Sequence, residues 1–281
     1  MTYIKSNINY IGNKYKLLPQ IIPLFPTDIN TFVDVFGGSG TVTFNVKANR
    51  YIYNDICKPV TSIINGMKNT AIQEILNRID SNISHYQLSK TNRNGFERLR
   101  DDYNNGKNDW ITLYTLMCYS FNYQFRFNNN HQYNSSFGKD RSSFSKRQRE
   151  NLILTKERLD DISIEFYSIN FKDLSIDNLS CLDFVYLDPP YLNSVGNYND
   201  GNRGFENWSQ DTEDKLKEKI MVLHNNKVRF ALSNNLTVNP DLENFAHEHG
   251  FQIHHLYSDY SNSSYNKKVK KQDDEVLITN Y

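Results

Sequence analysis

Short runs of apolar residues, each followed by turn residues or an acid, recur along the chain and predict a sheet of seven strands. A brief run of β-branched and aromatic residues bounded by turn signals is typical of a buried strand. Such runs cover residues 31–36, 50–55, 163–169, 182–188, 228–232, 251–256 and 275–281. Between several of them, apolar residues recur at helical spacing. Strands that alternate with helices in this way predict an α/β fold.

The pattern changes between the second and third strands, where a long insertion is predicted. Apolar residues at three- and four-residue spacing predict helices there, and the complete set of predicted helices is 15–25, 41–46, 58–79, 94–120, 211–225 and 240–249. Aromatic and amide residues over 121–128 and 133–139 predict a β-hairpin, and a basic stretch follows at 141–149. We therefore expect residues 58–160 to form an inserted domain, and residues 1–57 and 161–281 to form the sheet domain.

The strand over residues 182–188 ends in Asp188, Pro189, Pro190 and Tyr191, a pattern suited to activating an amine. The two prolines stop the strand, and open α/β sheets bind ligands at the carboxyl ends of their strands. The Asp188 carboxylate and the Pro189 carbonyl can accept hydrogen bonds from the exocyclic amine of a nucleobase, which frees its lone pair for attack. Tyr191 offers a ring on which a flipped-out base can stack.

A glycine-rich turn follows the first predicted strand. Gly37, Gly38 and Gly40 let the chain turn sharply and let a ligand approach the backbone. Their spacing differs from the dinucleotide-binding pattern and fits a nucleoside ligand without a pyrophosphate, as in sites for S-adenosylmethionine (SAM). The second strand ends in Asp55, which is placed to accept both hydroxyls of a ribose.

Composition and charge restrict the partners. The chain has 281 residues, and its 32 basic side chains balance 32 acidic ones, so any nucleic-acid surface must be a local basic patch. Cys57, Cys118 and Cys181 are far apart and give no disulfide or metal spacing. The paired histidines near the C-terminus lack a suitably spaced third ligand. No signal peptide or long apolar run is seen, so we expect a cytoplasmic protein without metal or membrane contact.

Several motifs, in one order over nearly the whole chain, resemble those of the Dam-type (D12 class) DNA adenine-N6 methyltransferases, and of their T-even bacteriophage branch in particular. The motifs are residues 10–14, 32–40, 54–55, 88–91, 99–103, 137–139, 171–173, 183–192 and 274–278. The resemblance implies a Rossmann-like SAM-dependent methyltransferase fold whose seven-stranded mixed sheet has one reversed strand near its end. It also implies that the insertion is a mainly helical target-recognition domain that carries the hairpin.

The resemblance also assigns roles to residues at matching positions. Asp188, Pro189, Pro190 and Tyr191 would hold the flipped adenine as the catalytic motif. The residues that would contact SAM or shape its turn are Tyr10, Lys14, Asp34, Phe36, Gly37, Gly38, Gly40, Asp55, Phe171 and Asp188. The adenine amine would attack the methyl group in line, and positioning would supply most of the catalysis. The sequence leaves open whether Asp188 then takes the proton or passes it to water.

In the hairpin, Arg126 matches the guanine-reading arginine of the family, and Asn128 is its near neighbour. Departures from the family pattern surround it: Gln124 replaces an apolar residue, no proline precedes Phe137, and Asp140 follows Lys139. These departures leave GATC open as the target. The other expected DNA-binding residues are Ser136, Lys139 and Arg141, together with Lys267 and Lys268 as phosphate contacts.

The expected activity is therefore site-specific adenine-N6 methylation of duplex DNA with SAM as methyl donor. Two alternatives remain at this point: methylation of RNA or of a protein amide, and a silent DNA-binding relative. The basic, amide-rich hairpin favours duplex DNA over the first, and the complete set of motifs disfavours the second. A monomer or weak dimer is expected in the cytoplasm of a bacterial or phage-infected cell, and a companion restriction nuclease is left open.

Overall fold

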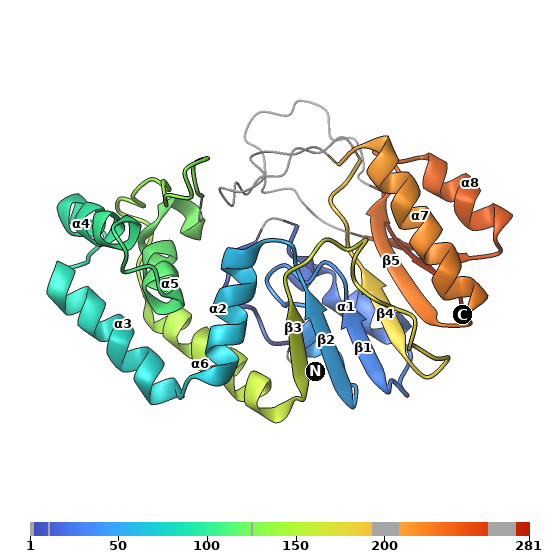
Figure 1. The fold of residues 1–281 in the computed structure, drawn as a ribbon, viewed down its shortest axis with the longest axis horizontal. Helices are drawn as coiled ribbons and strands as arrows, with labels where there is room; N and C mark the ends of the chain where they lie inside the picture. Colours follow the sequence, from blue (N-terminus) through green and yellow to red (C-terminus); the bar gives the residue numbers. More distant parts are fainter. Residues whose placement is uncertain (1–2, 11, 125, 193–207, 258–273) are drawn as a thin grey trace.

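A computed structural model describes residues 3–10, 12–124, 126–192, 208–257 and 274–281. Its centre is a seven-stranded sheet in the order β3-β2-β1-β4-β5-β7-β6 (Figure 1). The first five strands in this order pair in parallel, whereas β7 pairs antiparallel with both β5 and β6. The predicted α/β fold, with a mixed seven-stranded sheet and one reversed strand, is confirmed. The strands are β1 (Thr31–Asp34), β2 (Arg50–Asn54), β3 (Ile164–Tyr167), β4 (Phe184–Leu187), β5 (Arg229–Asn235), β6 (Gln252–Leu256) and β7 (Glu275–Thr279).

Both faces of the sheet are covered, which explains why its strands read as continuous apolar runs. Along β4, Phe184 and Tyr186 point into one hydrophobic core and Val185 and Leu187 into the other, and all four are buried. The helices α7 (Gln210–Asn225) and α8 (Asp241–Glu248) lie beside the half of the sheet that contains β4 and β5 (Figure 1). Since β1, β2 and β4 are parallel, their carboxyl ends meet at one edge of the sheet.

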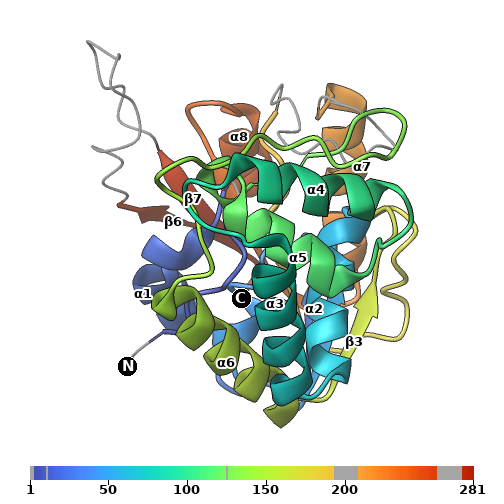
Figure 2. The ribbon, with the colours of Figure 1, turned by 90° about the vertical axis from the view of Figure 1, so that its left-hand side faces the viewer.

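The five helices between β2 and β3 pack against one another at one end of the molecule (Figures 1 and 2). They are α2 (Lys58–Asn69), α3 (Ile72–Tyr86), α4 (Arg93–Asn104), α5 (Trp110–Tyr119) and α6 (Lys146–Asp161). The single helices predicted over 58–79 and 94–120 were wrong, because each is a pair of helices. Thr70 and Ala71 are extended and separate the first pair. Gly106 separates the second pair at a φ of +115°, and Asp109 then caps α5.

Two shorter predicted helices also differ from the structure. Residues 15–25 form the 3₁₀ turn η1 (Lys14–Lys16), the short helix α1 (Leu18–Ile21) and a second 3₁₀ turn η2 (Ile22–Leu24). Pro19 and Pro23 lack a backbone N–H and favour such short turns over one continuous helix. Residues 41–46 contain only the 3₁₀ turn η3 (Thr43–Asn45).

The predicted hairpin is present as a loop that returns on itself, but its two arms do not form regular strands. Two isolated antiparallel bridges join Ser120 to Phe137 and Phe127 to Tyr133. At the root, within η4 (Phe121–Tyr123), Asn122 and Tyr123 have φ values of +54° and +56°, which turns the chain away from a ladder.

The Asn104 side chain of α4 fixes the return arm. Its Oδ1 accepts from the Tyr133 N–H at 2.7 Å, and its Nδ2 donates to the Tyr133 carbonyl at 3.1 Å. An amide side chain therefore replaces the strand neighbour that Tyr133 would have in a sheet.

Candidate active site

Asp188 directly follows β4 and forms a buried ion pair with Lys14. The Lys14 Nζ lies 2.7 Å from Asp188 Oδ1, and the side chains are only 5% and 16% exposed. Burial raises the pKa of Asp188, and the Lys14 ammonium opposes that rise. The structure thus brings together two predicted site residues that are far apart in the sequence. Pro189 is buried, and Pro190, the next residue, is exposed.

The segment that carries Lys14 is attached to the glycine turn. The Asn13 side chain donates to Ser39 Oγ at 3.0 Å and to Thr41 Oγ1 at 2.9 Å, and its Oδ1 accepts from the Tyr15 N–H at 2.8 Å. Asn13 therefore caps the 3₁₀ turn at which Lys14 begins and holds it beside the turn. Lys14 owes its position next to Asp188 to this attachment.

The glycine turn requires two of its glycines. Gly38 and Gly40 have φ values of +51° and +73°, a region that residues with a Cβ adopt at a cost. A Cβ on Gly40 would lie 2.4 Å from the Phe44 ring, and one on Gly38 would lie 3.0 Å from the Tyr10 ring. The Tyr10 ring therefore packs over the turn, so this predicted cofactor residue lies beside the predicted cofactor loop.

Asp55 follows β2 and closes the glycine turn from the other side. Its Oδ2 accepts from the Gly38 N–H and its Oδ1 from the Cys57 N–H, both at 2.8 Å. The residue is 6% exposed. The Asp55 carboxylate therefore ties the glycine turn to the residues that follow β2.

Asp34 ends β1 and is buried beneath the turn. Its Oδ2 accepts from the Thr43 hydroxyl at 2.6 Å, and its Oδ1 is among the buried polar atoms that have no hydrogen-bond partner in the described structure. Desolvation, with a smaller contribution from Asp188 and Asp55, raises the pKa of Asp34 to about 7. Asp34 therefore supports the turn from below, where the carboxyl group is poorly solvated.

Three aromatic rings form a cluster beside the turn, and one of them, Trp208, was missed by sequence reasoning. The Phe36, Phe171 and Trp208 ring centroids lie 5.4 to 5.7 Å apart. Trp208 Nε1 donates to the buried carboxylate of Glu213, which also accepts from Asn239. Trp208 lies outside any recognisable motif, so only its three-dimensional contacts link it to Phe36 and Phe171.

Tyr191 is held by a second residue that the sequence did not indicate. Its hydroxyl donates to the Glu275 carboxylate, with oxygen distances of 2.6 and 2.8 Å. The Lys14 Nζ lies 5.6 Å from the centroid of the Tyr191 ring, within range of a cation–π contact. Lys14, Asp188, Tyr191 and Glu275 therefore form one connected group at this edge of the sheet.

The predicted DNA-binding residues gather on the hairpin. Phe127, Tyr133, Ser135 and Phe137 are buried, whereas the predicted residues Arg126, Ser136, Lys139 and Arg141 are exposed. Gln124 and Asn128 are half-buried, and Asn128 bonds to Gln132 within the loop tip. The Arg141 guanidinium lies 5.5 Å from the Phe121 ring centroid. Lys267 and Lys268 lie outside the described residues.

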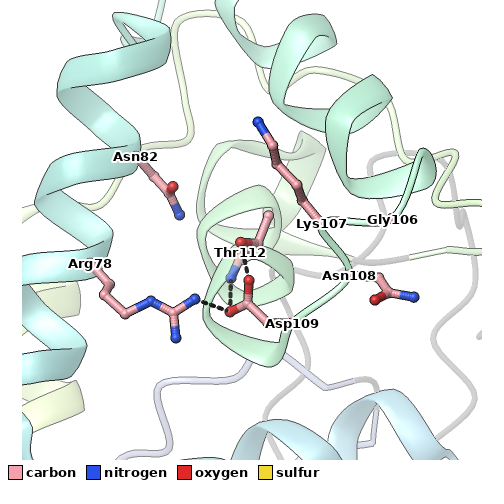
Figure 3. A pocket seen from close by; sticks show the side chains of 7 residues that line it. All are labelled: Arg78, Asn82, Gly106, Lys107, Asn108, Asp109 and Thr112. Atoms are coloured by element: carbon pink, nitrogen blue, oxygen red, sulfur yellow. Dashed lines mark hydrogen bonds and ion pairs between the residues drawn. The ribbon is translucent and has the colours of Figure 1, made fainter.

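The described part of the chain contains no cluster of three or more His, Cys, Asp or Glu that could hold a metal ion, and none of its helices is long and apolar enough to span a membrane. An open depression of about 440 Å³ lies between α3 and the loop that precedes α5 (Figure 3). The Arg78–Asp109 ion pair lies in this depression, far along the chain from the Asp188 group.

A mixed sheet in this strand order, with a glycine turn after β1 and Asp-Pro-Pro-Tyr after β4, is the arrangement of a Rossmann-like methyltransferase. The sequence comparison defines the family: residues 10–272 match the model of the D12 class N6 adenine-specific DNA methyltransferases. This chain belongs to that family. The family resemblance seen in the sequence is thereby confirmed, whereas the comparisons do not show the particular likeness to the T-even phage branch.

Several curated relatives are type II methyltransferases or modification methylases by name. The chain is 46% identical to the type II methyltransferase M.FokI of Planomicrobium okeanokoites, 43% identical to the modification methylase StsI of Streptococcus sanguinis and 33% identical to the modification methylase LlaI of Lactococcus lactis subsp. lactis. These alignments cover 99 to 100% of this chain. They cover 43% of each relative, so the chain spans less than half of their length.

Proposed function

We propose that the chain is an active, SAM-dependent methyltransferase that transfers a methyl group to N6 of a flipped-out adenine in duplex DNA. The observation that carries this proposal is the Lys14–Asp188 ion pair, which lies at the end of β4 and next to the glycine turn. Family membership supports adenine N6 as the acceptor. The two remaining requirements are a cofactor site and a surface that selects the base.

The residues around the glycine turn fit the chemical groups of SAM. Gly38 and Gly40 give the turn its positive-φ backbone, the Asp55 carboxylate beside it supplies acceptor oxygens of the kind that bind ribose hydroxyls, and Phe36 and Phe171 offer an apolar surface for an adenine ring. Tyr10 and Lys14 border the same turn, Gly37 lies within it, and Asp34 ends the strand that precedes it. When bound, SAM supplies an electrophilic methyl group.

Asp188 and the Pro189 carbonyl are proposed to orient the target amine. Ionised Asp188 is the stronger acceptor for a hydrogen bond from N6, because a charged carboxylate makes charge-assisted hydrogen bonds. Burial opposes that ionisation, and the Lys14 ammonium favours it. The amine, held by two acceptors, would attack the methyl group in line as the bond between that methyl group and the SAM sulfur breaks, which leaves S-adenosylhomocysteine. The proton that N6 then gives up would pass to Asp188 or to water. Tyr191 would provide the ring against which the flipped base stacks. Holding the reactants in this geometry supplies most of the rate enhancement.

The hairpin is proposed as the part that selects the DNA site, within a target-recognition unit formed by residues 58–160. Arg126 is exposed and has the forked donor geometry that reads guanine, and exposed Arg141 and Lys139 are suited to phosphates. Gln124, Asn128 and Ser136 would contribute to the same surface. GATC is the candidate target, and changes at Gln124, Ser136 and Asp140 would account for a different one. The names of the relatives favour a role beside a restriction nuclease.

An Asp188→Ala variant tests the proposed function. We expect methyl transfer to DNA to be lost, because N6 loses its charged acceptor, while SAM binding measured by calorimetry survives at least in part. Unchanged turnover in this variant would contradict the proposal. Transfer from the wild-type enzyme to RNA or protein but not to duplex DNA would favour the alternative substrates, and tight DNA binding with no transfer would favour a silent binding protein.

A further inference from the structure

Glu275 lies at the candidate active site, although the motif that contains it, residues 274–278, was given no role in the predicted site. It is the first residue of β7, the reversed strand, and is only 3% exposed. Its carboxylate accepts the Tyr191 hydroxyl through both oxygens, at 2.8 Å to Oε1 and 2.6 Å to Oε2. Tyr191 and Glu275 are 84 positions apart in the sequence, so only the fold brings them together.

The sheet holds the Glu275 carboxylate in place. Glu275 pairs in register with Asn235 at the end of β5. The Asn235 side chain is 2% exposed, and its Nδ2 lies 3.4 Å from Glu275 Oε1. The Glu275 carboxylate is buried on an interior strand beside an amide. It therefore loses little further conformational freedom when it accepts a hydrogen bond from a hydroxyl. It is therefore a rigid support for a ring outside the sheet.

The Tyr191 ring is constrained at two points. Glu275 holds its hydroxyl, and the Lys14 ammonium lies 5.6 Å from the ring centroid. The same ammonium pairs with Asp188. The ring is thus fixed relative to the carboxylate that is proposed to orient the adenine amine. A hydroxyl donating to a carboxylate is one of the stronger hydrogen bonds in proteins, so the support is substantial.

We propose that Glu275 is a positioning residue for methyl transfer: by holding the Tyr191 hydroxyl, it fixes the ring in the orientation on which the flipped adenine stacks. This inference rests on the proposed function and extends it to a residue on the reversed strand. Glu275 acts through Tyr191 and does not touch the reacting atoms. Its absence therefore loosens the stacking platform and leaves the cofactor turn intact.

The proposal requires that residue 275 accept a hydrogen bond from the Tyr191 hydroxyl. It does not require that residue 275 carry a negative charge. The Glu275 charge raises the pKa of Asp188, which opposes the ionised state that the reaction needs. A glutamine retains an acceptor oxygen and removes that charge. Glu275→Gln is therefore the conservative variant that keeps Tyr191 in place, whereas Glu275→Ala removes the acceptor.

The test is a double-mutant cycle on the full chain with Glu275→Ala, Tyr191→Phe and the variant that combines both. Single-turnover methyl transfer, SAM affinity and the fluorescence of 2-aminopurine at the target position would be measured. We expect each single variant to lose about tenfold in rate, since each removes the same charge-assisted hydrogen bond, with SAM affinity unchanged. The combined variant is expected to be no slower than the slower single variant.

Several outcomes would overturn the inference. Multiplied losses in the combined variant, or an equal loss of SAM affinity, would show that Glu275 acts independently of Tyr191. If Glu275→Ala does not fold, the other two variants still test the proposal. Wild-type turnover in Tyr191→Phe would contradict it, and so would a full loss of turnover in Glu275→Gln. Tyr167→Phe is the matched control, because the Tyr167 hydroxyl also donates to a carboxylate, that of Glu165, at 3.1 Å on the edge strand β3, and this variant should keep the wild-type rate.

The proposed function and this inference fail in different ways. If the wild-type protein transfers no methyl group to any DNA, the proposed function fails. If wild-type transfer is normal and Tyr191→Phe equals it in rate and 2-aminopurine signal, the function stands and only the role of Glu275 is contradicted.

Discussion

Asp34 is a carboxyl group whose burial works against the folded state at neutral pH. Its pKa is raised from 3.8 to about 7 by burial. Between these two pH values the unfolded chain releases the proton of Asp34 and the folded chain keeps it. The contribution of Asp34 to stability is therefore fully present below pH 3.8, falls as the pH rises, and is lost above about pH 7.

An Asp34→Asn variant should consequently gain stability relative to the wild type as the pH rises from about 4 to about 7, by up to about 4 kcal/mol. The amide cannot ionise, so the pH-dependent penalty disappears. Urea unfolding of both proteins at several pH values measures the difference. A difference in unfolding free energy that stays constant with pH would contradict the raised pKa of Asp34.

Lys14 should control the pH at which the site becomes active. Burial raises the pKa of Asp188 and Lys14 opposes the rise, so a Lys14→Met variant leaves Asp188 with a higher pKa. Because the ionised carboxylate is the active form, activity is lost as the pH falls through this pKa. The acid limb of the pH profile, measured with saturating SAM, should therefore shift to higher pH in the variant. An acid limb at the wild-type position would assign Lys14 to cofactor binding alone.

At the scale of elements, substitutions in the hairpin should distinguish a residue that reads a base from one that contacts a phosphate. Arg126→Ala should relax discrimination at one base pair of the site and cost roughly 1–3 kcal/mol there. Arg141→Ala serves as the control, since loss of a phosphate contact should weaken binding to all sequences alike and reduce its salt dependence. Methylation rates on sites substituted one base pair at a time supply the comparison. Uniform weakening by Arg126→Ala would make that residue a phosphate contact.

The elements also show what the sequence could predict. Strands and the Asp188 motif were found because burial on both faces gives continuous apolar runs, and prolines mark where β4 ends. The breaks between α2 and α3 and between α4 and α5 were missed, because helical spacing continues across a short extended connection. The hairpin was predicted as regular strands, whereas the positive φ angles of Asn122 and Tyr123 turn its first arm away from a ladder, a conformation that the sequence does not signal at a tyrosine.

The candidate site was predicted to the extent that its residues lie in motifs. Asp34 ends a strand, and Asp55 and Asp188 each directly follow one, so their shared edge could be inferred from the parallel order of the strands. Glu275 and Trp208 could not be found in this way. Their roles depend on contacts with Tyr191 and with Phe36 and Phe171, which only the three-dimensional fold creates.

At the scale of the whole molecule, the balance of charge makes DNA binding a local matter. The chain has equal numbers of basic and acidic residues, so attraction to DNA must come from surfaces such as the hairpin with Lys139 and Arg141. The carboxyl edge of the sheet brings the cofactor turn, Asp188 and Tyr191 together. One chain therefore contains both the candidate reading surface and the candidate chemistry.

The central claim is tested most directly by transfer of labelled methyl groups from SAM to unmethylated duplex DNA, followed by mapping of the modified bases, with RNA and protein as parallel acceptors. The account predicts N6-methyladenine in duplex DNA at one short sequence, either GATC or a site to which the hairpin changes have redirected the enzyme. Label in RNA or protein with none in duplex DNA, or no label at all while SAM and DNA both bind, would contradict it.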